Sequence, residues 1–123
     1  MFKFSFLIAA ILFIMFDSIY LNLIKNYFMN QIKKVQGSTI KINIIATFIC
    51  YIFLITGLNY FIIGPKKSPR DAFLFGLIIY GVYETTNWAL FTNWSPITVI
   101  MDTLWGATLF GLVTFIVQKI PIK

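Results

Sequence analysis

The chain has 123 residues, of which 59% are hydrophobic, 19% aromatic and only 11% charged. A soluble domain has about 25% charged residues, and a chain this short exposes a large share of its surface, so a water-soluble globular fold is excluded. The net charge of +6 does not point to nucleic acid, because the basic residues lie at the ends of apolar runs. There they act as orientation signals and contact anionic lipid, so we expect membrane lipid as the partner.

Four apolar runs have about the 20 residues that a helix needs to cross the hydrocarbon core of a membrane. They cover residues 4–24, 44–63, 72–91 and 97–118. Turn and capping residues separate them, namely Gly37-Ser38, Gly64-Pro65 and Ser95-Pro96. We therefore predict one domain over residues 1–123, an all-α integral membrane four-helix bundle. Part of the stretch 25–43 is expected to form a helical extension along the membrane interface.

Four spans would place both ends of the chain on one side of the membrane. Six basic residues then fall on that side and four on the other. Because cytoplasmic loops carry an excess of Lys and Arg, this distribution predicts cytoplasmic termini in a multi-pass protein of a plasma or inner membrane. The pairs Ala72 with Gly76 and Ala107 with Gly111 predict positions where helices approach closely.

The chain has no histidine and a single cysteine, Cys50, within an apolar run. Zinc sites of the His-rich kinds, haem ligation by His, and Ser-His or Cys-His catalysis are therefore excluded for this chain alone. No intrachain disulfide can form. We expect no cofactor, and any chemistry has to use carboxylates.

Three acidic residues lie inside the apolar runs: Asp17, Glu84 and Asp102. A carboxylate near the bilayer centre costs about 2.5 to 3.5 kcal/mol on insertion scales, so three of them require an explanation. At 1.5 Å per residue, Asp17 and Glu84 lie about 10 Å from the far end of their helices, and Asp102 about 8 Å from the start of its own. The three acids are thus predicted to converge in one layer inside the bundle.

Residues three or four positions apart share a helix face. The polar residues placed beside the acids in this way are Tyr80 and Asn87 for Glu84, Tyr20 for Asp17, and Trp105 for Asp102. No Lys, Arg or His within the spans neutralises the acids. Either some of them are protonated, Glu84 first, or an external cation lies among them, so Asp17, Glu84 and Asp102 are also candidate metal ligands.

Three functions remain open. In the first, the acids form a site that binds or conducts a proton or a hard cation, helped by the Asn87 oxygen, in a homo-oligomer that encloses the pathway. The second is a membrane-embedded enzyme that uses two carboxyls as acid and base on a lipid or isoprenoid. The third is a non-catalytic assembly or accessory subunit, in which neutral acids hydrogen-bond across helices and only hold the bundle together.

Three motifs carry a family resemblance: Asp17 with Tyr20, the stretch from Tyr80 to Asn87, and Asp102-Thr103-Leu104-Trp105-Gly106. With them the chain resembles the small predicted membrane proteins of domain-of-unknown-function family 2177. Glu84 stands where an aspartate is usual in that family, and Tyr20 where a tryptophan is common. The resemblance implies four spans and an integral membrane location, and it implies no particular activity.

Overall fold

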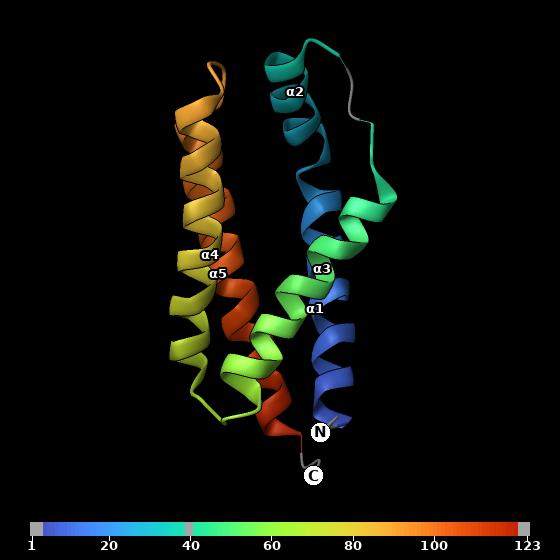
Figure 1. Ribbon diagram of the computed structural model, residues 1–123, viewed down its shortest axis with the longest axis vertical. Helices are drawn as coiled ribbons and strands as arrows, with labels where there is room; N and C mark the ends of the chain where they lie inside the picture. The colour runs from blue at the N-terminus through green and yellow to red at the C-terminus, as the bar shows by residue number, and fades with distance from the viewer. Residues whose placement is uncertain (1–3, 39–40, 121–123) are drawn as a thin grey trace.

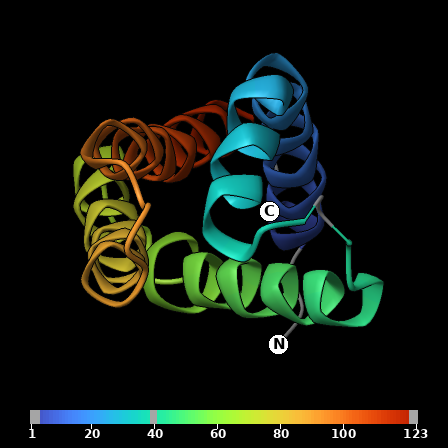
Figure 2. The ribbon, with the colours of Figure 1, turned by 90° about the horizontal axis from the view of Figure 1, so that it is seen from above.

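The computed structural model describes residues 4–38 and 41–120, and its elements are all helical. They are α1 (Phe4–Leu23), α2 (Lys25–Gln36), α3 (Ile44–Leu58), the π-helical turn η1 (Asn59–Ile63), α4 (Pro69–Leu90) and α5 (Pro96–Lys119). The long helices run alternately up and down the long axis of the molecule (Figure 1). Seen from above, they form a ring (Figure 2). The predicted all-α fold is confirmed.

Three helical segments are long and apolar enough to cross a membrane: Phe4–Leu23, Ile44–Ile63 and Pro96–Lys119. They correspond to three of the four predicted spans, and their length and apolar composition would allow them to cross a membrane. The fourth, α4, has 22 residues but is the least apolar of the long helices, because it carries Glu84 and the polar residues around it. The structure therefore supports a multi-pass helical membrane protein, without confirming a four-span bundle.

Side-chain caps define where the helices begin. The Ser68 hydroxyl accepts a hydrogen bond from the Asp71 backbone N–H at 3.1 Å, and Pro69 is the first residue of α4. Helix α4 thus starts three residues before the predicted boundary, since a capping Ser followed by Pro already provides a helix start. The predicted start at Ser95 is confirmed, since its hydroxyl caps α5. Gly37 ends α2 in the left-handed conformation, with φ 77°.

Helix α2 continues from α1 along the long axis of the molecule (Figure 1) and does not turn across it. Gln31 explains this position. Its side-chain amide donates to the Asn93 carbonyl at 2.7 Å, and its Oε1 accepts from the Ser95 N–H and the Thr98 hydroxyl at 3.0 and 2.8 Å. The helical extension is confirmed, but its expected position along the interface is replaced by docking on the α4–α5 connection.

Helices α4 and α5 approach most closely where small residues face each other. A Cβ added at Gly76 would lie 2.6 Å from the Gly106 carbonyl oxygen, and one added at Gly106 would lie 2.0 Å from the Tyr80 ring. Ala72 and Ala107 are fully buried. The close approach predicted from these small residues is confirmed, and it brings the Tyr80 ring across α5.

The apolar core lies between α1, α3 and α5. It fills the space between the helices on the side of the acids where α1 begins. Phe13, one turn before Asp17, is fully buried and meets the ring of Phe110 edge-on, with centroids 5.4 Å apart. Leu58 and Val113 are fully buried in the same cluster. The acids therefore stand above a packed layer that separates them from the end at which α1 begins.

The α4–α5 contact predicts opposite outcomes for two glycines of the same helix. Gly76→Ala should lower the free energy of unfolding by about 1 to 3 kcal/mol, because overpacking forces the two helices apart. Gly81→Ala should be neutral or stabilising, because its Cβ would meet nothing closer than the Thr103 methyl group at 3.8 Å. Unfolding of each variant in mixed detergent measures the difference. Equal effects at both positions would contradict this packing.

Candidate functional site

The acids of α1 and α5 exchange aromatic hydrogen-bond donors. The Trp105 indole N–H donates to Asp17 Oδ1 at 2.9 Å, and the Tyr20 hydroxyl donates to Asp102 Oδ1 at 3.1 Å. The two rings stack between these bonds, with centroids 4.6 Å apart and planes 7° from parallel. Tyr20 and Trp105 are the donors that helical spacing singled out. Each of them, however, serves the acid on the opposite helix, so the pair links α1 to α5 twice.

Asp17 receives a second donor from α3. The Tyr51 hydroxyl donates to Asp17 Oδ2 at 2.5 Å, so both oxygens of this buried carboxylate are hydrogen-bonded. Bonds to a charged acceptor are stronger than neutral ones, and this carboxylate is stabilised without a basic partner. Sequence reasoning missed Tyr51, because it lies in the one span that contains no acid and nothing near it in sequence marks it.

Glu84 is fully buried. Its Oε1 accepts the Trp94 indole N–H at 2.9 Å, while Oε2 has no donor among the residues that the structure describes. The Glu84 carboxyl group is close enough to the Asp102 carboxyl group for the two to interact. Two carboxyl groups form a hydrogen bond only when one of them carries a proton, because an ionised carboxylate is an acceptor only.

The three acids thus belong to one polar layer that runs from Trp94 in the α4–α5 connection to Tyr51 on α3. Asp17 and Glu84 are buried and Asp102 is half-buried, so a cluster of three buried carboxylates is not confirmed. No Lys or Arg occurs between residues 4 and 24 or between 72 and 118. The chain therefore supplies these acids with neutral donors instead of ion pairs.

The expected metal site is not formed in this geometry. Within residues 4–38 and 41–120, no three His, Cys, Asp or Glu side chains are placed to hold a metal ion together. The physical reason is that the acids turn toward aromatic donors on neighbouring helices: both oxygens of Asp17, one of Asp102 and one of Glu84 are occupied in this way. Asp17, Glu84 and Asp102 consequently do not converge as ligands of one ion.

The remaining predicted site residues take separate places. Asn87 is half-buried and lies beside Tyr83, one turn earlier on α4. Tyr80 is half-buried and lies over Gly106. Its ring lines the same cavity as Asp17 and Asp102, which is described next. Of these two residues, only Tyr80 therefore belongs to the site.

A cavity of about 500 Å³ opens beside the acid layer. Its polar lining consists of two acids, four tyrosines, a threonine and a cysteine: Asp17, Asp102, Tyr20, Tyr51, Tyr80, Tyr83, Thr47 and Cys50. The rest of the wall is mainly apolar and comes from α1, α2, α3 and α4. Small-molecule sites have volumes of about 300 to 1,000 Å³ and combine apolar walls with a few converging polar groups, as this cavity does. Glu84 is not among the residues that line it.

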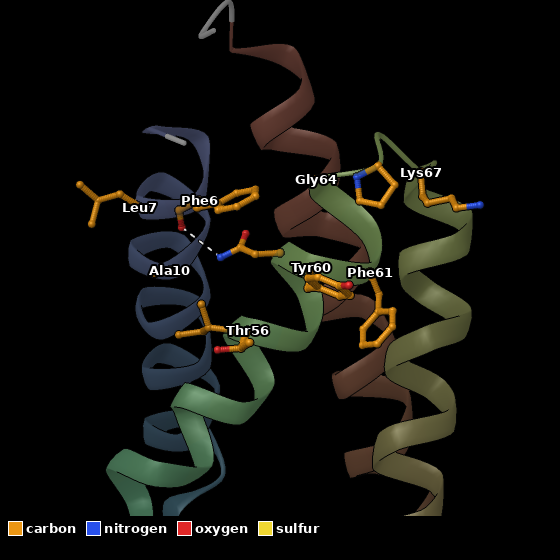
Figure 3. Close-up of a pocket in the computed structure, with 11 residues that line it drawn as sticks. Phe6, Leu7, Ala10, Thr56, Tyr60, Phe61, Gly64 and Lys67 are labelled. Carbon is orange, nitrogen blue, oxygen red and sulfur yellow. Dashed lines mark hydrogen bonds between the residues drawn. The ribbon is translucent and has the colours of Figure 1, made fainter. Parts of the chain in front are cut away.

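A second hollow lies near the opposite end of the molecule, between α1, α3 and η1 (Figure 3). Its volume is about 890 Å³ and none of the acids lines it. The two spaces are therefore chemically distinct, the first acidic and aromatic, the second largely apolar.

Comparison with known proteins gives a family and no activity. The family model described as "Predicted membrane protein (DUF2177)" matches residues 2–118. No curated protein and no solved structure matches the chain. The function has to be argued from the site.

The exchanged donors make Trp105 more important for stability than a tryptophan on the outer surface. Trp105→Phe should lower the free energy of unfolding by about 1 to 3 kcal/mol, because Asp17 loses a hydrogen bond while its charge stays buried. Trp88→Phe is the matched control, since Trp88 is 49% exposed and should change stability little. Equal losses in the two variants, measured by unfolding in detergent, would show that the Trp105 bond is not special.

Proposed function

Since the chain belongs to the DUF2177 family of predicted membrane proteins, we propose that it is a multi-pass membrane protein that binds a proton between Glu84 and Asp102 and exchanges it with the cavity beside Asp17. The observation that carries this proposal is the proximity of the two carboxyl groups. Glu84 is fully buried, and its Oε2 has no hydrogen-bond partner in the described part of the chain. A proton held between the two carboxyl groups would give both of them a hydrogen bond.

The positions of the two acids give the proton a direction of access. Asp102 lines the cavity, whereas Glu84 is enclosed between Asp102 and the buried indole of Trp94. A proton therefore reaches Glu84 from the cavity through Asp102. On the other side, Glu84 Oε1 is held by the buried Trp94 indole of the α4–α5 connection.

The proton site suits a transport function better than a purely structural one. A structural role needs each acid to be neutral and fully hydrogen-bonded across helices. Asp17 is fully hydrogen-bonded, but the Glu84–Asp102 pair stays beside a cavity that has room for water or a small molecule. Cytoplasmic termini, which the basic residues favour, would place the acid layer nearer the outer face. A homo-oligomer would complete a pathway that one small bundle does not enclose.

The second candidate is an acid–base enzyme acting on a lipid or isoprenoid. The observation in its favour is the cavity itself, which combines two carboxyl groups with four tyrosines and apolar walls. Aromatic faces would stabilise a positively charged intermediate. A lipid that copurifies with the protein, and that is chemically altered by wild type but not by Asp102→Asn, would support this candidate over transport.

Proton movement tests the first proposal. Purified protein in liposomes should dissipate an imposed pH gradient, and Glu84→Gln and Asp102→Asn should each reduce the rate to that of protein-free liposomes, because either change removes the shared proton. Asp71→Asn is the matched control, since Asp71 is the fourth acid of the chain and is exposed in the first turn of α4.

The control variant should keep the wild-type rate. A wild type without proton flux, or a flux that survives Glu84→Gln, contradicts the proposal. An equal loss in Asp71→Asn would show that the effect comes from net charge and not from the site.

A further inference from the structure

The hollow of Figure 3 has a volume of about 890 Å³, and the proposed proton site does not use it. It lies near the end at which α1 begins and α5 ends (Figure 1). Phe6, Leu7 and Ala10 of α1 and Ile55 of α3 form much of its apolar wall. An apolar wall at this depth faces the hydrocarbon just inside the membrane interface, so the natural occupant has an apolar chain.

One buried polar atom in this hollow has no partner. Asn59 lines the hollow and is only 8% exposed. Its Nδ2 donates to the Phe6 carbonyl at 3.4 Å, a long bond, and its Oδ1 accepts no hydrogen bond from residues 4–38 or 41–120. Buried polar atoms are nearly always hydrogen-bonded, because leaving one without a partner costs free energy. Asn59 Oδ1 thus requires a donor from beyond these described residues.

The backbone around Asn59 departs from the α-helix where it forms the hollow. Asn59 begins the π-helical turn η1, which ends with the Gly64 N–H donating to the Asn59 carbonyl at 2.8 Å. A Cβ at Gly64 would lie 3.0 Å from that carbonyl oxygen, so the glycine allows the turn to close. π-Helical turns inside α-helices occur frequently at functional sites. Here the turn presents Asn59 to the hollow.

Positive charge lies above Asn59, toward the end of the molecule. Lys67 lines the rim eight residues after Asn59, and its ammonium group points outward from the bundle (Figure 3). Lys66 and Arg70 are exposed beside it. Basic clusters at the ends of membrane helices bind anionic lipid headgroups. Ala10 and Thr56 lie deeper in the hollow, whereas Phe6, Leu7 and Lys67 lie nearer the end of the molecule (Figure 3), so positive charge is found only at the outer rim.

We infer that this hollow binds a monoacyl glycerophospholipid. The acyl chain lies against the α1 and α3 wall, the free glycerol hydroxyl donates to Asn59 Oδ1, and the phosphate meets Lys67. The free hydroxyl selects this class. In a diacyl phospholipid both glycerol oxygens at that depth are esterified, and esters can only accept hydrogen bonds, so they leave Asn59 Oδ1 without a donor.

Matched ligands test the inference without any change to the protein. Native mass spectrometry of wild-type protein in a non-ionic detergent should show a 1-acyl lysophosphatidate binding about tenfold more tightly than its 2-deoxy analogue, which lacks only the hydroxyl. A diacyl phosphatidate of the same chain length should also bind more weakly. Equal binding of all three lipids would overturn the inference, and would mean that water or annular lipid serves Asn59.

Variants assign the effect to named side chains. Asn59→Leu should abolish the preference for the hydroxyl-bearing lipid while still binding both analogues. Lys67→Gln should weaken all the phosphate lipids severalfold and keep the preference, because the phosphate contact is separate. Lys119→Gln is the matched control, being an exposed lysine at the same end of the molecule, and should change neither. A preference that persists in Asn59→Leu would contradict the assignment.

Discussion

The structure depends on one constraint: three carboxyl groups lie within residues 4–24 and 72–118, which contain no Lys, Arg or His to pair with them. Burying a charge is tolerated only when hydrogen bonds replace the lost water, and in lipid the available donors are the aromatic N–H and O–H groups. The exchange between α1 and α5 is the result. Trp105 serves Asp17, Tyr20 serves Asp102, and the stacked rings hold both bonds in place.

Other features of the fold follow from keeping this layer in position. Helix α3 contributes Tyr51 to Asp17, and the α4–α5 connection contributes Trp94 to Glu84. Gln31 in turn fixes that connection to α2. The small residues between α4 and α5 bring the two backbones close enough for Glu84 and Asp102 to meet. Packing at glycine and hydrogen bonding at the acids are thus parts of the same arrangement.

Much of this architecture is predictable from the sequence because it depends on local rules. Apolar runs, the Ser95-Pro96 cap and the small residues on α4 and α5 define helices and contacts within a few residues. Helical spacing also identifies Tyr20 and Trp105 as donors. The exchange between helices is not predictable in this way, because it depends on the rotation of α1 against α5. Tyr51 and Gln31 act over 34 and at least 62 residues of sequence, and no local pattern marks them. Helix α4 is not among the candidate spans because Glu84, an acid of the site, makes the helix less apolar.

The proposed function requires that Glu84 and Asp102 hold a proton between them. Glu84 is the only glutamate in the chain, so protein labelled with ¹³C at the glutamate carboxyl carbon reports on this residue alone. Its chemical shift in detergent or bilayers at pH 7 distinguishes a protonated or proton-sharing carboxyl from an ionised one. A shared proton predicts a chemical shift displaced from the ionised value in wild type. In Asp102→Asn the shift should move to the ionised value, because the introduced amide donates to Glu84 in place of the proton. An ionised signal in wild type at pH 7 would contradict it.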